Sequence, residues 1–280
     1  MSDSKTKIVM LGTGTPRADE KRAQSCVAII VNEQPYLIDF GAGVVQRTVQ
    51  AHNMGITALH SRNLTRAFVT HMHADHTIGY GDLIFTPWMQ GRKNPLEVYG
   101  PRGLNMMTDH INQAYAISTE EHIKSHPTDE DGYKVNAHEF ESGEIYSDDN
   151  VRVEAFRVDH GYLNAFGFKF STDQHSIVIS GDTKPTDALI EMATGCDVLI
   201  HEVYSVKGFQ SHTDKWQTYH SRVHTSSHEL AEIANKARPK LLILYHQLMW
   251  TANEDELLSE IRERYKGKVE SAQDLDVFEL

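Results

Sequence analysis

The sequence is poor in cysteine and contains no long apolar run. Its 280 residues include two cysteines, Cys26 and Cys196, and each lies in or beside an apolar segment. This scarcity argues against a disulfide framework and favours a reducing compartment. The longest apolar stretches, such as residues 26–31, are far shorter than the roughly 18 residues that a bilayer-spanning helix needs. Residues 1–7 mix charges and do not resemble a signal peptide. We therefore expect a cytoplasmic protein without a membrane segment.

Positive charge is scarce as well. The chain has 27 Lys and Arg against 39 Asp and Glu, a formal net charge of −12. Because contacts to phosphate depend on Lys and Arg, we do not expect nucleic acid as a partner. Hydrophobic residues make up 40% of the chain, which excludes a disordered or low-complexity protein. We find no linker and no internal repeat, so residues 1–280 are predicted to form one domain.

The order of apolar segments predicts the fold class. Strands joined by tight turns are expected at residues 7–11, 25–31 and 35–40, and strands and helices alternate after them. The acidic stretch 118–150 is expected to be a solvated, partly loop-like face, and residues 203–225 are expected to form a loop, since they show no clear period. This pattern predicts an α/β protein in which two mixed sheets pack face to face with helices on the outer faces.

Histidine is abundant, with 17 residues, and four ligand-type side chains gather in one motif. The motif runs from His71 to His76, directly after a predicted strand. Residues i and i+2 of an extended chain point to the same side, so His71 and His73 can bind one ion. The turn at Ala74 then directs Asp75 and His76 toward a second position. Imidazole together with carboxylate fits a hydrolytic site with two metal ions.

Three later predicted strands also end in ligand-type residues. These residues are His160, Asp182 and His246. Side chains on loops at the ends of rigid strands suit a preorganised site, so these three could complete the coordination of two ions.

In chain order, these residues resemble the metallo-β-lactamase-fold hydrolases. The resemblance rests on Leu11–Gly14, Asp39–Gly41, His71–His76, His160, Gly181–Thr183 and His246. Within this family the chain is similar to the branch of ribonuclease Z and arylsulfatase-like proteins. The segments that carry this similarity are Thr86–Trp88, Val98–Pro101, Val158–His160, His201–Tyr204 and His224–Ser226. The resemblance implies the αββα sandwich of the metallo-β-lactamase fold.

The resemblance also implies a ligand set. One metal ion would be held by His71, His73 and His160, and a second by Asp75, His76 and His246. Asp182 would bridge both ions, and Asp39 would orient ligands through hydrogen bonds. We expect two divalent ions, zinc first, with manganese or iron(II) as alternatives.

The implied activity is the hydrolysis of ester-type bonds by a metal-bridging hydroxide, with aryl sulfates or phosphodiesters as substrates. Asp75 would orient the nucleophile, and His224, steadied by Glu202, would protonate the leaving group. The alternatives are a lactone or β-lactam hydrolase of the same fold, an iron-dependent redox protein, and a non-catalytic metal-binding module.

Two departures from ribonuclease Z argue against tRNA processing. Only residues 161–181 separate His160 from Asp182, where ribonuclease Z proteins usually carry a long RNA-binding arm. Residues 247–250, Gln-Leu-Met-Trp, replace the Ser and Arg expected for a phosphate. The expected partner is therefore a small anionic ester, and the resemblance suggests a homodimer.

Aromatic residues on the expected mouth loops predict an apolar pocket beside the metals. They are Trp88, Phe209, Trp216 and Trp250. Core packing or a subunit contact is the alternative interpretation of these side chains.

Overall fold

The computed structural model describes residues 5–280, so the part of the signal-peptide prediction that concerns residues 1–4 lies outside the described residues. The chain divides into two compact units. Unit 1 comprises residues 5–12, 18–140 and 274–280, and unit 2 comprises residues 13–17 and 141–273. Each unit contains one seven-stranded mixed sheet with its own helices, as the predicted fold class requires.

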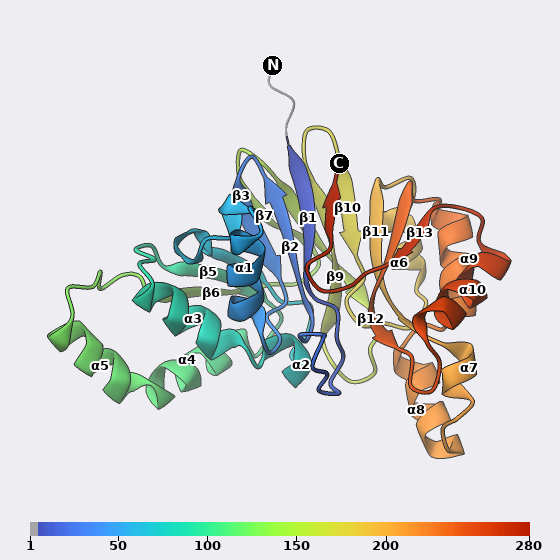
Figure 1. The fold of residues 1–280 in the computed structure, drawn as a ribbon, viewed down its shortest axis with the longest axis horizontal. Helices are drawn as coiled ribbons and strands as arrows, with labels where there is room; N and C mark the ends of the chain where they lie inside the picture. Colours follow the sequence, from blue (N-terminus) through green and yellow to red (C-terminus); the bar gives the residue numbers. More distant parts are fainter. Residues whose placement is uncertain (1–4) are drawn as a thin grey trace. The chain divides into compact units, whose positions relative to one another are not determined.

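The sheet of unit 1 has the strand order β14-β1-β2-β3-β4-β5-β6 (Figure 1). Its strands are β1 (Thr6–Gly12), β2 (Cys26–Val31), β3 (Gln34–Ile38), β4 (Arg66–Phe68), β5 (Leu96–Gly100), β6 (Val135–Glu139) and β14 (Val277–Glu279). Pairing is antiparallel from β14 to β3 and parallel from β3 to β6. The carboxyl ends of β3, β4 and β5 therefore meet at one edge, and the chain leaves β4 there toward His71.

The helices α1 (Val44–Asn53), α3 (Tyr80–Met89) and α4 (Leu104–Ala114) contribute buried residues to the core of this unit. The short helix α2 (Ala74–Thr77) precedes α3, and α5 (Ala116–Ser125) extends beyond α4 (Figure 1). Two 3₁₀ turns lie at Thr57–Leu59 and Ser61–Asn63. Alternate strand residues such as Val9, Leu11 and Ala28 point to the same face and pack in one core with Val44 of α1 and Leu83 of α3.

A buried arginine holds α3 in place. Pro87 lies inside α3 and cannot donate the hydrogen bond that the Leu83 carbonyl would otherwise receive. Arg92, only 1% exposed, donates instead from Nη1 to Leu83 O at 2.9 Å and from Nη2 to Ile84 O at 2.7 Å. Its Nε also donates to Gly132 O at 3.1 Å. Burial lowers the pKa of Arg92 to about 10, so the guanidinium stays charged at neutral pH.

Unit 2 has the strand order β13-β12-β11-β10-β9-β8-β7. Its strands are β7 (Gly143–Ser147), β8 (Arg152–Val158), β9 (Ala165–Ser171), β10 (Ser176–Ile179), β11 (Val198–Tyr204), β12 (Leu241–Leu248) and β13 (Val269–Ser271). Pairing is antiparallel from β7 to β10 and parallel from β10 to β13.

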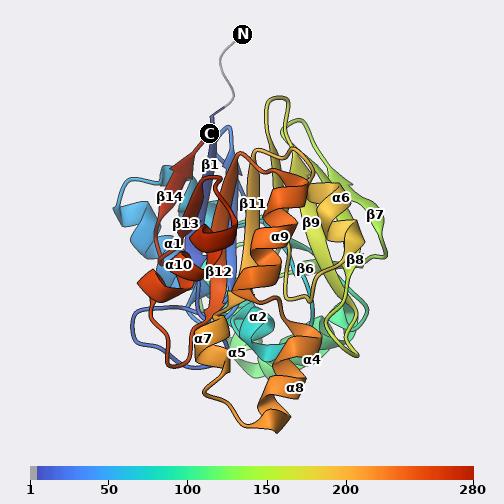
Figure 2. The same cartoon turned by 90° about the vertical axis from the view of Figure 1, so that its right-hand side faces the viewer.

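The helices of unit 2 are α6 (Asp187–Ala193), α7 (Val206–Phe209), α8 (Asp214–Val223), α9 (Ser227–Ala237) and α10 (Glu254–Arg264). Figure 2 shows α9 lying along the sheet, with α8 extending beyond its end. Capping boxes at Ser226 and Asn253 start α9 and α10 by satisfying backbone N–H groups of their first turns. Leu230 and Leu257 from these helices pack in one core with Leu242 of β12.

The secondary structure of two segments differs from the prediction. The acidic stretch 118–150 is mostly exposed, as expected of a solvated face, but it contains most of α5 and the strands β6 and β7 where the prediction was partly loop-like. Residues 203–225 form α7 and α8. Because α8 buries only His220 and Val223, few apolar residues mark this helix in the sequence.

Among residues 5–280, no helix combines the length and apolar character needed to cross a bilayer.

Candidate metal centre

The ligand-type motif of unit 1 follows β4 and continues into α2. His71 and His76 are fully buried, and Asp75 is 4% exposed. His71 Nε2 lies 3.0 Å from His73 Nδ1, and His76 Nε2 lies 3.5 Å from Asp75 Oδ2. Each of these two pairs therefore offers donor atoms close enough to share one cation. The structure brings together the residues that the sequence predicted within this motif.

Asp39 sets the orientation of two of these imidazoles. Its carboxylate accepts from His76 Nδ1 at 2.8 Å and from the Thr70 hydroxyl at 3.0 Å. Because Thr70 gives its single hydroxyl hydrogen to Asp39, His71 Nδ1 at 3.0 Å must donate to Thr70 Oγ1. The neutral forms of His71 and His76 then carry their lone pairs on Nε2, the atom suited to a metal ion.

Two glycines let the Asp39 loop approach α2 closely. A Cβ on Gly41 would lie 2.3 Å from the Asp75 carbonyl oxygen, and a Cβ on Gly79 would lie 2.4 Å from the Gly41 carbonyl oxygen. The Phe40 N–H donates to His76 O at 2.8 Å across this contact. A side chain at either glycine would push Asp39 away from the histidines.

Unit 2 offers a second set of ligand-type residues at strand ends. His160 follows β8, Asp182 follows β10, and His246 lies in β12; these residues are 3%, 2% and 1% exposed. Asp182 Oδ2 lies 3.8 Å from His160 Nε2 and 3.5 Å from His246 Nε2. His160 Nδ1 donates to the carbonyl of Val223, the last residue of α8, at 2.7 Å, which places the lone pair of its neutral form on Nε2.

A bulge aims His246 at Asp182. The register between β11 and β12 shifts there, because Glu202 pairs with Tyr245 while Val203 pairs with Gln247. His246 is the extra residue, and its φ of 43° lies in the left-handed region. Bulges and positive φ at non-glycine residues are typical of functional sites, where they redirect a side chain.

Glu202 and His224 form a buried pair beside Asp182. His224 Nδ1 lies 3.1 Å from Glu202 Oε1 and 4.0 Å from Asp182 Oδ2. The backbone N–H groups of Thr183 and Thr225 also donate to Glu202 Oε1, at 3.1 and 3.2 Å. Burial, and then the nearby Asp182 charge, raises the pKa of Glu202 well above its usual range. The two threonines lie in motifs that the sequence singled out, but the sequence assigned them no role.

The donor set fits a transition metal. In unit 2 the acceptor atom of a neutral His160 faces a carboxylate in a buried site, and two acceptors so placed repel unless a cation lies between them. Imidazole nitrogen and carboxylate oxygen are also the ligands that zinc takes in hydrolytic sites. Both units therefore present residues that could hold divalent ions.

The four predicted pocket aromatics lie in different environments. Trp250 lies 6.4 Å from Phe209, and Tyr204 stacks on Phe209 at 5.0 Å, measured between ring centroids. Trp216 is 53% exposed on α8. Trp88 is 3% exposed in the core of unit 1 and donates from Nε1 to Asp129 O at 2.8 Å, so its placement is that of the core-packing alternative.

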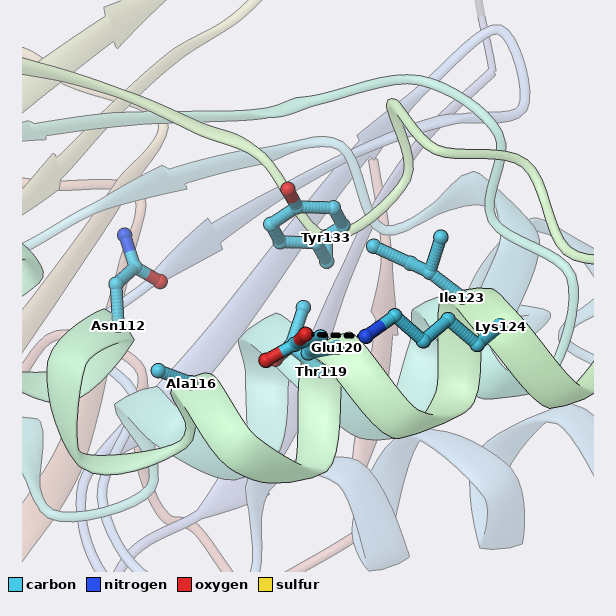
Figure 3. Close-up of a pocket in the computed structure, with 7 residues that line it drawn as sticks. All are labelled: Asn112, Ala116, Thr119, Glu120, Ile123, Lys124 and Tyr133. Carbon is cyan, nitrogen blue, oxygen red and sulfur yellow. Dashed lines mark hydrogen bonds and ion pairs between the residues drawn. The ribbon is translucent and has the colours of Figure 1, made fainter.

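A hollow of 320 Å³ lies on unit 1 along α5, where Tyr133 faces the helix (Figure 3). Its lining includes Ile123 and an ion pair between Lys124 and Glu120. It contains none of the predicted site residues.

Comparison with known proteins places this geometry in a family context. Residues 6–257 match the family model of the anti-Pycsar protein Apyc1. The curated ribonuclease Z of Mycobacterium bovis (strain BCG / Pasteur 1173P2) is 28% identical over 280 residues, covering 98% of each chain. The Bacillus subtilis metallo-β-lactamase fold protein YhfI has a TM-score of 0.76 at 18% identity over 99% of this chain and all of its own. The short form of human tRNase Z has a TM-score of 0.72 at 24% identity over 97% and 98% of the two chains.

These findings confirm the metallo-β-lactamase fold and the resemblance to ribonuclease Z. They overturn the expectation that a small anionic ester, and not nucleic acid, is the partner, because curated relatives aligned over nearly the whole chain are ribonucleases. Net charge was a poor guide, since it averages over surfaces far from any site. The missing arm was also a poor guide, because the M. bovis protein aligns over 98% of its own length. The comparisons do not show the expected arylsulfatase-like activity, zinc or homodimer.

The chain is a metallo-β-lactamase-fold, ribonuclease Z-like hydrolase, and it belongs to the anti-Pycsar protein Apyc1 family.

Proposed function

We propose that this chain is a metal-dependent phosphodiesterase that cleaves phosphodiester bonds of single-stranded RNA. The observation that carries the proposal is the pair of buried His and Asp sets at strand ends, each oriented by hydrogen bonds to groups of its own unit. The ribonuclease Z relatives support RNA over an aryl sulfate as the substrate.

Seven residues are proposed to bind two metal ions together. His71, His73 and His160 would hold one ion, and Asp75, His76 and His246 the other, with Asp182 shared by both. We also propose that residues 1–280 act as one domain. The metal is proposed to be zinc, for which the nitrogen-rich donor set is suited.

Bound divalent ions would supply an activated water and would neutralise charge on the phosphate. Side chains of the protein would orient the water, orient the ligands and supply the proton. Asp75 would orient the attacking water, and Asp39 would keep the Nε2 atoms of His71 and His76 available for metal. His224 would give a proton to the leaving oxygen while Glu202 holds its Nδ1–H.

The proposal can be tested with purified, metal-quantified protein. Its substrates would be a single-stranded RNA oligonucleotide, bis(p-nitrophenyl) phosphate and p-nitrophenyl sulfate. We expect both phosphodiesters to be cleaved, with loss of activity in EDTA and in His73→Ala. His110→Ala, which removes an exposed histidine of α4, is the matched control and should keep full activity. Activity that survives complete removal of metal, or cleavage of the sulfate alone, would contradict the proposal.

A further inference from the structure

The exposed face of α8 carries an aromatic pair. Trp216 is 53% exposed and Tyr219 is 44% exposed, and their ring centroids lie 5.8 Å apart at an interplanar angle of 87°. Large aromatic rings at the surface cost hydration free energy unless a ligand covers them. Because positions 216 and 219 are three residues apart, both rings lie on one side of the helix.

A row of neighbouring rings, called the ladder below, connects this pair to His224, the general acid of the proposed function. Trp216 stacks on His220 with centroids 5.7 Å apart and planes at 24°. His220 lies 5.6 Å from His224, with the two planes tilted by 33°. Trp216 and His220 are four residues apart on α8 and so lie on one side of the helix, and His224 is the residue that directly follows the helix. The end of α8 also meets the ligand set directly, because the Val223 carbonyl accepts from His160 Nδ1.

His220 has an unused hydrogen-bonding atom. The side chain is 8% exposed, and among the described residues its Nδ1 is buried without a hydrogen-bond partner. Trp250 backs the ladder, with its ring 4.8 Å from that of His220. Contacts with the Trp216 and Trp250 rings therefore hold His220 in position, and no hydrogen bond at Nδ1 does so among the described residues.

We propose that Trp216, Tyr219 and His220 form a platform for an unpaired nucleobase of the substrate, next to the scissile phosphate. This inference rests on the proposed phosphodiesterase function and identifies residues that would bind the base of its substrate. In a nucleotide, one sugar separates the base from its phosphate. In the structure, the His220 imidazole likewise lies between Trp216 and His224, the residue that follows α8. The base would stack on the exposed Trp216 and Tyr219 rings, and the His220 ring, which stacks on Trp216, would hold the Trp216 ring in place. Stacking of this kind accepts any base.

The test compares substrates with and without a base. We would measure kcat and KM for a dinucleoside monophosphate and for its abasic analogue, in which the sugar next to the cleaved bond carries no base and no other aromatic ring. Trp216→Ala should raise KM for the dinucleotide about tenfold, in line with the loss of one stacked base, and leave kcat and the base-free substrate unchanged. Trp216→Phe should restore most of the affinity. Thr218→Ala, an exposed position of the same helix without an aromatic ring, is the matched control.

Several outcomes would overturn the platform. Equal losses on both substrates, or no loss on either, would remove the role of Trp216 in base binding. A change in oligomeric state of Trp216→Ala, seen by size-exclusion chromatography with light scattering, would assign Trp216 to a contact between copies of the chain.

A wild-type protein that cleaves neither substrate would refute the proposed function but not the platform. In that case, quenching of tryptophan fluorescence by uridine monophosphate decides. Quenching that is lost in Trp216→Phe supports the platform, and its absence in the wild type rejects it.

Discussion

Replacing Asp39 by asparagine should weaken metal binding without emptying the ligand set. The carboxylate accepts four hydrogen bonds: from Thr70 N at 2.8 Å, Thr70 Oγ1 at 3.0 Å, His76 Nδ1 at 2.8 Å and Ser25 Oγ at 3.3 Å. An asparagine keeps one acceptor oxygen and adds an NH2 group. If the NH2 faces His76, the imidazole must accept at Nδ1 and carry its proton on Nε2, where the metal would bind.

The opposite rotamer fails for a related reason. The NH2 group would then face the backbone N–H of Thr70, and two donors would oppose each other in a buried site. Replacing the hydrogen-bond partner of a metal ligand typically lowers the affinity for the metal about 10- to 100-fold, or by about 1.4 to 2.7 kcal/mol. Apo-protein stability should fall by about 1 to 3 kcal/mol as well.

The assay is a zinc titration in competition with a chelator of known affinity, at a temperature where both proteins are folded. Asp39→Asn should bind zinc about 10- to 100-fold more weakly than the wild type. Ser25→Ala is the control, because it removes a single longer bond to the same carboxylate and should change the affinity less than threefold, or about 0.7 kcal/mol. Wild-type affinity in Asp39→Asn would refute the reasoning that this carboxylate sets the imidazole tautomers.

Three further predictions follow from the same contacts. His224→Ala should lower kcat by about 10²- to 10⁴-fold, the usual contribution of general acid catalysis, and flatten the alkaline limb of the pH–rate profile; an unchanged profile rejects the acid role. Arg92→Met should lower the free energy of unfolding by about 3 kcal/mol in urea titrations, since several buried carbonyls lose their donor. Adding Pro87→Ala should recover part of this loss, because it restores a helical N–H that can donate to Leu83 O. If the effects of the two substitutions simply add, the account is contradicted. Burial lowers the pKa of His201 to about 4, and its unfolded value is about 6.5. Below that value the unfolded state binds the extra proton, so stability falls as pH drops through the window from 6.5 toward 4, by about 2 kcal/mol between pH 7 and pH 5. His201→Gln should show a shallower pH dependence of the urea midpoint, and equal slopes would reject this role.

The sequence predicted those elements whose apolar pattern is set by burial. The strands expected at residues 25–31 and 35–40 correspond to β2 and β3 within two residues at each end, because nearly all of their residues are buried. The helices α5 and α8 were missed, since they leave most of their residues exposed and bury few or no side chains. Strand β13 has only three residues, too few to show alternation.

The candidate site was visible in the sequence only as a set of residue types. The spacing from His71 to His76 indicated candidate metal ligands. The hydrogen bonds that join Asp39 to Thr70 and Thr70 to His71 could not be predicted, because they depend on how the fold places these side chains. The bulge at His246 likewise leaves no mark in the sequence. Trp88 shows the opposite error, because an aromatic residue in a predicted loop is a core residue inside α3.

Counting metal in the active protein tests the central claim most directly. We would measure bound transition metal per chain by plasma mass spectrometry alongside phosphodiesterase activity, in the wild type and in His246→Ala. The account predicts two divalent ions per chain in the wild type, and one or fewer with lost activity in the variant. A wild-type protein that cleaves phosphodiesters at full rate with no bound transition metal, or a variant that keeps both ions, would contradict it.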